Sequence, residues 1–122
     1  MKRYWDNLAT FDQENFEVHV EKSWEDIHPG DCFDDSCYNI KEMCEKIDRG
    51  DLDWFMLRVR VLYDGVELAE EYVGGFLYEN AQDVLNDGTA EDIVWTAVAA
   101  AKIRARELST KMNQLVQELE PA

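Results

Sequence analysis

The sequence predicts an α+β fold, in which a small antiparallel sheet (a strand, a helix and a β-hairpin in chain order) packs on a long C-terminal helix. Three patterns predict this fold: alternation of apolar and polar residues at 16–21, a hairpin signal at Asp64-Gly65, and a heptad repeat of apolar residues from Val94 to Leu119. A chain of 122 residues, 46% of them apolar, can form one domain with a buried core. We therefore expect a single domain over 1–122, divided into an acidic α+β body (1–92) and a long amphipathic helix (93–119).

Local patterns predict the first strand and the first helix. Phe16, Val18 and Val20 alternate with polar residues, which is typical of a half-buried strand. An N-cap at one of residues 34–36 is expected to start a helix that ends at about Arg49. The apolar face expected for this helix consists of residues three, four or seven apart: Cys37, Ile40, Met43, Cys44 and Ile47.

The hairpin is the clearest local element. Two apolar segments, 54–63 and 66–73, flank Asp64-Gly65, which is a strong signal for a two-residue turn. Counted back from such a turn, Arg58 pairs with Glu71 and opposite charges share one face of the sheet.

This simple register places Glu70 on the apolar face. Two explanations remain open: a β-bulge shifts the register, or Glu70 has a specific partner. Gly74-Gly75 lies where a bulge is expected.

The last predicted element is a helix of about 30 residues, which would be roughly 45 Å long at 1.5 Å per residue. Its apolar residues are spaced four and three apart along one seam: Val94, Val98, Ala101, Ala105, Leu108, Met112, Leu115 and Leu119. The Val/Ala half suits close packing on the sheet, whereas the Leu/Met half is expected to extend past the sheet. We expect a homodimer through this second half, formed by Leu108, Met112, Leu115 and Leu119; the alternative is that the first helix and the N-terminal segment cover it.

Charge is unevenly distributed along the chain. The net charge is −15, from 27 acidic and 12 basic residues. Residues 1–92 carry 24 acidic and 8 basic residues, a net −16, and residues 93–122 carry 3 and 4, a net +1. Such a field repels nucleic acid and anionic membranes and attracts basic surfaces. We therefore expect no direct nucleic-acid binding and no membrane association.

Cysteine usage and the absence of long apolar segments indicate a compartment. No run of 18 apolar residues occurs, and the N-terminus lacks the apolar stretch of a secretory signal. The three cysteines are odd in number and lack the spacing of a disulfide framework, which favours reduced thiols. These features predict a cytoplasmic location, in the host cytoplasm if the gene belongs to a phage.

No motif in the sequence indicates a reaction. His28, Cys32, Cys37 and Cys44 are potential zinc ligands, but they include no Cys-x-x-Cys pair. Cys32 with His28 and an acid is the only candidate nucleophilic arrangement, and no local signature supports it. Gly74-Gly75 lacks the residues of a phosphate loop. We predict no catalytic residue, no metal, no cofactor and no enzymatic activity.

The acidic residues between the first strand and the hairpin form the candidate binding site. Ten acids fall in Ser23–Asp53, interleaved with aromatic residues such as Trp24 and Tyr38. A surface that mixes carboxylates and aromatics suits a groove lined by Arg and Lys on another protein. The predicted partner-binding residues are Glu25, Asp26, Asp31, Asp34, Asp35, Glu42, Glu45 and Asp48. A merely solvated acidic surface is the other interpretation of this cluster.

In size, acidity, compact α+β pattern and lack of catalytic motifs, the chain resembles the small proteins that phages use against bacterial defences, namely anti-CRISPR and DNA-mimic anti-restriction proteins. The acidic clusters Glu25-Asp26 and Asp34-Asp35 carry the resemblance. It implies an inhibitor whose carboxylates replace phosphates in the nucleic-acid site of a basic protein, or one that blocks a surface without mimicry. The alternative is a dimeric adaptor or immunity protein that acts through the C-terminal helix or the hairpin.

Overall fold

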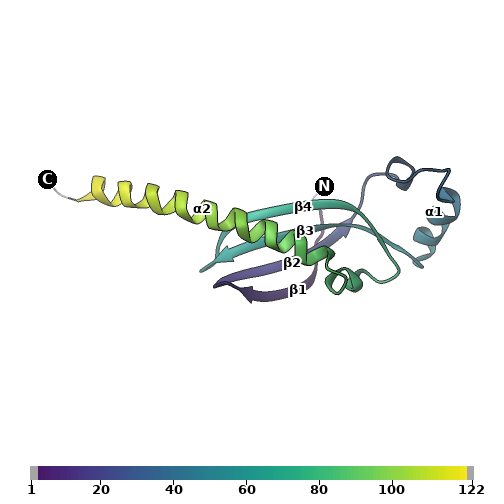
Figure 1. Cartoon of the computed structure of the whole chain (residues 1–122), viewed down its shortest axis with the longest axis horizontal. Coiled ribbons are helices and arrows are strands. Elements are labelled where there is room, and N and C mark those ends of the chain that lie inside the picture. The colour runs from purple at the N-terminus through teal and green to yellow at the C-terminus, as the bar shows by residue number, and fades with distance from the viewer. Residues whose placement is uncertain (1–2, 121–122) are drawn as a thin grey trace.

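The computed structural model describes residues 3–120 and confirms the expected α+β fold. Four antiparallel strands follow one another in the order β1-β2-β3-β4, and the long helix α2 crosses one face of the sheet (Figure 1). The elements are β1 (Asp6–Gln13), β2 (Phe16–Trp24), η1 (Pro29–Asp31), α1 (Ile40–Arg49), β3 (Asp53–Tyr63), β4 (Val66–Tyr78), η2 (Ala81–Leu85) and α2 (Thr89–Leu119).

The core lies between the sheet and the first half of α2. On the sheet it is formed by inward-facing residues of the central strands, which are fully buried: Val18, Val20, Leu57, Val59 and Val61. The helix contributes three residues of the predicted seam, Val94, Val98 and Ala101, and two further small residues that were not part of it, Ala90 and Ala97. These short side chains let the helix axis approach the sheet closely, as expected for the Val/Ala half.

The strand β1 is not anticipated by the sequence pattern. The consecutive apolar residues Leu8 and Ala9 interrupt the period-2 signal, and a bulge between Asn7 and Ala9 lets both of them pack against the core. The turn to β2 also lacks the glycine that usually signals a two-residue turn. Its two left-handed positions are occupied by Glu14 (φ 50°) and Asn15 (φ 71°).

The hairpin has the predicted turn but not the simple register. Tyr63 pairs with Val66, and a bulge between Val61 and Leu62 then places Arg58 opposite Tyr72 instead of Glu71. Of the two explanations for Glu70, the bulge is therefore correct, since it turns the Glu70 side chain to the polar face, opposite Arg60. A second register shift, between Phe55 and Leu57, occurs opposite the glycine pair, as expected.

The helix α1 begins later than predicted. Its N-cap is Asn39, whose Oδ1 accepts a hydrogen bond from the Glu42 amide at 3.0 Å. Asp34, one of the three candidate caps, instead closes a turn by accepting a hydrogen bond from the Ser36 amide at 2.9 Å. Cys37, predicted on the apolar face of the helix, consequently lies before the helix and is exposed.

The second half of α2 extends past the edge of the sheet into solvent (Figure 1). The alternative, in which the first helix and the N-terminal segment cover it, is wrong, because α1 lies at the opposite end of the molecule and Met112, Leu115 and Leu119 are exposed. Within residues 3–120, no helix has both the length and the apolar character that crossing a bilayer requires.

Candidate functional site

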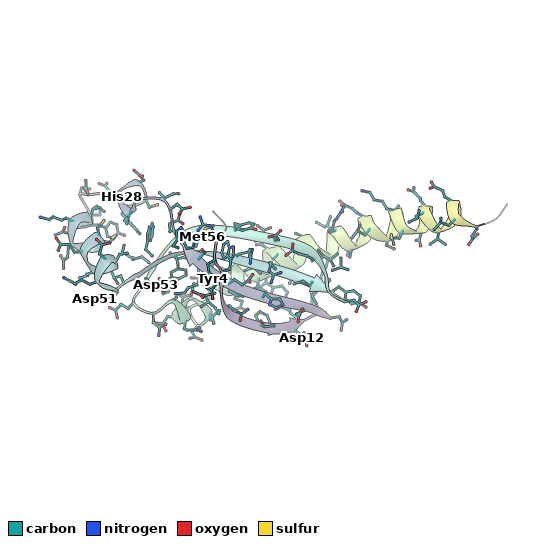
Figure 2. The ribbon with its side chains drawn as sticks, turned by 180° about the vertical axis from the view of Figure 1, so that it is seen from behind. Tyr4, Asp12, His28, Asp51, Asp53 and Met56 are labelled. Atoms are coloured by element: carbon teal, nitrogen blue, oxygen red, sulfur yellow. The ribbon has the colours of Figure 1, made fainter. Side chains whose placement is uncertain are left out.

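The acidic segment forms a lobe beyond one end of the sheet. We call residues 25–53 the acidic lobe; it contains η1 and α1 and connects β2 to β3 (Figure 1). Seen from the other side, His28 and Asp51 lie in the lobe, whereas Asp12 lies at the far end of the sheet (Figure 2). Ten acidic and three basic residues give the lobe a net charge of −7.

An aromatic cluster attaches the lobe to the sheet. Trp54 at the start of β3 is buried, and its Nε1 donates a hydrogen bond to the Ile27 carbonyl at 2.8 Å. The Phe33 ring packs on Trp54 and on Tyr38, with ring centroids 5.8 and 5.0 Å apart. These contacts hold the lobe against the sheet.

Some of the predicted partner-binding carboxylates serve the fold itself. Glu25 is half-buried, and its two oxygens accept hydrogen bonds from the Gly75 amide at 2.8 Å and the Ile27 amide at 3.2 Å. Asp26 forms an ion pair with Arg3. These two side chains therefore have structural partners within the chain.

Two further carboxylates of the predicted set have weaker internal contacts. The pKa of Asp34 lies below its usual value because its carboxylate accepts the backbone hydrogen bond of Ser36. Glu42 pairs with Lys46 one turn along α1, at 3.3 Å. Both side chains remain exposed, so these contacts leave them accessible.

The remaining carboxylates of the predicted set face solvent. Four of them form no ion pair within residues 3–120: Asp31, Asp35, Glu45 and Asp48. Glu45 and Asp48 follow Glu42 at intervals of three along α1, and the buried Met43 marks the opposite, inward side of the helix. The outer surface of α1 therefore carries the most continuous row of exposed carboxylates.

The histidine and cysteines of the lobe do not form the arrangement considered from sequence. His28 Nε2 lies 3.7 Å from the Cys44 sulfur, so its contact is Cys44 and not Cys32. His28 Nδ1 accepts a hydrogen bond from the Gly30 amide at 2.9 Å, which places the proton of the neutral ring on Nε2. A protonated Nε2 cannot accept the thiol proton, so this pair is not set up as a nucleophile and base. No cluster of three or more metal-ligating side chains occurs within residues 3–120.

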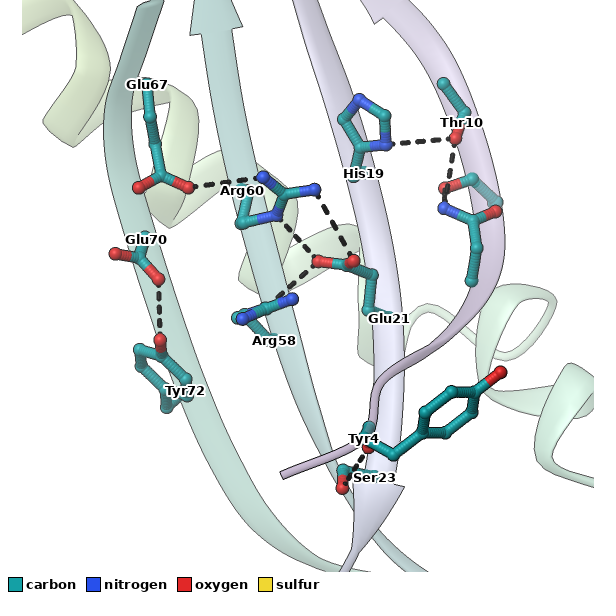
Figure 3. A network of polar contacts seen from close by, with 12 residues as sticks. Tyr4, Thr10, His19, Glu21, Ser23, Arg58, Arg60, Glu67, Glu70 and Tyr72 are labelled. Carbon is teal, nitrogen blue, oxygen red and sulfur yellow. Dashed lines mark hydrogen bonds and ion pairs between the residues drawn. The ribbon is translucent and has the colours of Figure 1, made fainter. Parts of the chain in front are cut away.

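The sheet face opposite α2 carries a polar network, in which the sequence indicated the charged face of the hairpin but not the central residue from β2 (Figure 3). Its centre is Glu21, which is only 7% exposed and accepts hydrogen bonds from Arg58 Nε at 3.0 Å and Arg60 Nε at 2.8 Å. Burial raises the pKa of Glu21, but the hydrogen bonds and charges of the two arginines outweigh it, and the net pKa lies below its usual value.

The rim of this network is formed by β4 and the N-terminal segment. Tyr72 donates its hydroxyl to Glu70 at 2.5 Å, and Arg60 contacts Glu67 at 3.6 Å. Burial and the neighbouring Glu70 raise the pKa of Glu67. Trp5 stacks under the Arg58 guanidinium, 4.3 Å from the ring centroid, so part of the face is closed by the chain itself.

The predicted dimer residues lie on the far half of α2. Leu108 is half-buried beside the sheet, whereas three residues are exposed: Met112 by 56%, Leu115 by 43% and Leu119 by 72%. An apolar stripe therefore continues from the core onto the free end of the helix.

Comparisons of the chain with models of protein families, with curated proteins and with solved structures give no match.

Proposed function

We propose that the chain is a non-enzymatic inhibitor, which places the acidic lobe on a basic nucleic-acid-handling protein and blocks the nucleic-acid site. The observation that supports this function is the set of exposed carboxylates on α1 and in the segment that precedes it. Asp31, Asp35, Glu45 and Asp48 have no internal ion pair among the described residues, and they lie on a lobe that projects from one end of the sheet. The chain resembles in composition the anti-CRISPR and DNA-mimic proteins, among which carboxylates that replace phosphates in a nucleic-acid site are one mode of inhibition.

The physical basis of binding is electrostatic complementarity. A patch of net charge −7 raises the association rate with a basic channel and makes it fall steeply with salt. The exposed aromatic residues Trp24 and Tyr38 lie beside this charge and provide apolar contact area. Neither the electrostatic attraction nor the apolar contact requires a cofactor or a reaction step.

The test is a DNA-displacement assay with purified CRISPR effector complexes and type I restriction enzymes. We expect the chain to release labelled DNA from at least one of these complexes, more effectively at 50 mM than at 300 mM salt. A triple variant, Glu42→Lys, Glu45→Lys and Asp48→Lys, is expected to lose at least about tenfold in potency, which corresponds to 1.4 kcal/mol.

The matched control changes the net charge by the same amount elsewhere. The variant Asp12→Lys, Glu17→Lys and Glu107→Lys alters exposed acids outside the lobe: Asp12 and Glu17 lie opposite each other on β1 and β2, and Glu107 lies on α2. It is expected to retain most of the potency. Equal potency of the lobe variant and the wild type, or no displacement from any of the complexes, would refute the proposal.

A second candidate function is a dimeric adaptor or immunity protein, and the exposed second half of α2 favours it. Such a protein would lose its activity when the α2 stripe is disrupted and keep it when the lobe charges are reversed. The two sets of variants therefore separate the two functions.

A further inference from the structure

We propose that the exposed half of α2 binds a second copy of the chain, with the two helices antiparallel and the end of each helix seated in a groove beside the other copy's sheet. The inference does not depend on the proposed function. It rests on the apolar stripe, on the groove next to it and on the charges that flank the stripe.

The groove lies where α2 leaves the sheet. It has a volume of about 840 Å³ and is bounded by the turns between β1 and β2 and between β3 and β4. Its apolar lining comes from Phe16, Val66 and Leu68 on the sheet and from Leu108 and Met112 on the helix. The stripe and the groove are therefore one continuous apolar surface.

Helix geometry decides which occupant reaches this groove. If two stripes pack antiparallel with Met112 against the partner's Leu115, Leu108 lies opposite the partner's Leu119. Leu119 is 72% exposed in the single chain, and this pairing brings it to the rim of the partner's groove. A parallel pair would direct both free ends away from the grooves and leave them open.

Charge favours the same orientation. Lys111 and Glu118 are seven residues, or about two turns, apart and lie on the same edge of the stripe. In the antiparallel pair each Lys111 lies beside the partner's Glu118, which gives two symmetric ion pairs. In a parallel pair the same two positions would face Val116 or residues beyond the helix, and no charge pair would form.

The groove is also needed for sufficient contact. The overlap from Leu108 to Leu119 is only about 18 Å long at 1.5 Å per residue, shorter than the three to four heptads of a typical coiled coil. The two grooves add apolar surface at both ends of this short overlap, where Val66 is 55% exposed.

The first test measures mass as a function of concentration by sedimentation equilibrium. We expect the wild type to be a dimer at 50 µM and Leu115→Asp to be a monomer, a loss of at least about 100-fold in affinity because each dimer would bury two carboxylates. The matched control is Ile103→Asp, since Ile103 is 55% exposed but lies on the opposite side of α2 and is expected to leave the dimer intact. Circular dichroism checks that each variant is folded.

The second test separates the groove from the helix pair. Val66→Asp changes the groove without touching α2, and we expect it to weaken the dimer at least about tenfold, a change of 1.4 kcal/mol. A dimer that is lost in Leu115→Asp but unaffected by Val66→Asp would refute the seating of the helix end in the groove.

The third test fixes the orientation. Lys111→Glu and Glu118→Lys are each expected to weaken the dimer by about tenfold, because each replaces two attractions by two repulsions. The double variant, which restores opposite charges, is expected to recover the wild-type affinity. Single variants with no effect would refute the antiparallel arrangement, and a wild-type chain that is monomeric at 50 µM would refute the dimer itself.

Discussion

At the scale of single residues, the most consequential side chain is Glu21. It lies on a sheet face that no described helix covers, yet it is almost fully buried, because Arg58 and Arg60 on the adjacent strand close over it. One carboxylate thereby bridges two guanidinium groups and offsets part of the repulsion between Arg58 and Arg60, which lie two residues apart on the same strand. This network fixes the pairing of β2 with β3.

We predict that Glu21→Gln lowers the free energy of unfolding by about 2 kcal/mol, since hydrogen bonds to charged groups contribute about 1.5–3 kcal/mol each and the amide retains only part of the acceptor capacity. Urea unfolding at pH 7 measures this change. The matched control is Glu17→Gln on the same face of β2, where the side chain is exposed and a change within about 0.5 kcal/mol is expected.

The difference in unfolding free energy between the wild type and Glu21→Gln is expected to depend on pH. The pKa of Glu21 is lowered in the folded state, so its stabilisation is complete above the ordinary pKa of 4.5 and is lost as the pH falls through the lowered value. The difference between wild type and Glu21→Gln should therefore shrink below pH 4.5. A difference that stays constant from pH 7 to pH 3 would show that the charge of Glu21 is not the cause. Glu67, whose pKa is raised, acts with the opposite sign but is present in both proteins.

This network also shows where sequence reasoning ends. The hairpin partners of Arg58 and Arg60 could be counted from the turn, apart from the bulge that moved Glu70 opposite Arg60. Glu21 could not be assigned to them, because β2 and β3 are joined by the 28 residues 25–52. Local periodicity does not fix the register of strands separated by such a connection.

At the scale of elements, the bulge in β4 provides a second contact between the sheet and the acidic lobe, in addition to the aromatic cluster. Gly75 has φ 81°, and its amide donates to Glu25 at the start of the lobe. A Cβ at Gly74 would lie 2.2 Å from Glu25 Oε2, so the carboxylate occupies the space that a side chain would fill. The sequence indicated a bulge at this pair but not its partner, since the contact joins residues 50 positions apart.

We predict that Gly74→Ala destabilises the fold by about 2 kcal/mol, because it displaces Glu25 and leaves the Gly75 amide without its acceptor. A double-mutant cycle with Glu25→Ala tests the cause. In the Glu25→Ala background the methyl group meets no carboxylate, so Gly74→Ala should cost at least 1 kcal/mol less, within the usual range of coupling between contacting residues. Additive effects in urea unfolding would contradict this account of the bulge.

The elements that the sequence predicted well are those with uninterrupted periodicity. The division of α2 into a packed Val/Ala half and an exposed Leu/Met half follows directly from residue size along one seam. In contrast, β1 contains a bulge, and the start of α1 was shifted because the Asp34 side chain closes a turn instead of capping a helix. In both cases a local backbone irregularity replaced the regular pattern.

At the scale of the whole molecule, charge and apolar surface lie at opposite ends. The acidic lobe projects from one end of the sheet and the exposed half of α2 from the other (Figure 1). A dimer through α2 would place its two lobes at its two extremities, each free to bind. A partner with two basic sites would then be bound with a higher effective concentration than one lobe provides.

The clustering of acidic residues in the lobe also makes the free energy of unfolding depend on the salt concentration. At 10 mM salt the screening length is about 30 Å, and the like charges of the lobe repel one another; at 150 mM it is about 8 Å. We predict that the unfolding temperature of the wild type rises by several degrees, about 1 kcal/mol of stability, between these two conditions. The buried Glu21 network is screened much less and should not reverse this trend.

Two variants of equal net charge decide whether the lobe or the whole chain causes this dependence. Reversal of Glu42, Glu45 and Asp48 to Lys changes the charge from −15 to −9, as does reversal of Asp12, Glu17 and Glu107. If repulsion is concentrated in the lobe, where 29 residues carry −7, the first variant should lose most of its salt response and the second should keep it. Thermal unfolding of both variants at both salt concentrations gives the four unfolding temperatures that are compared. An equal loss in both variants would mean that the net charge of the molecule, and not its segregation into the lobe, sets the electrostatic stability.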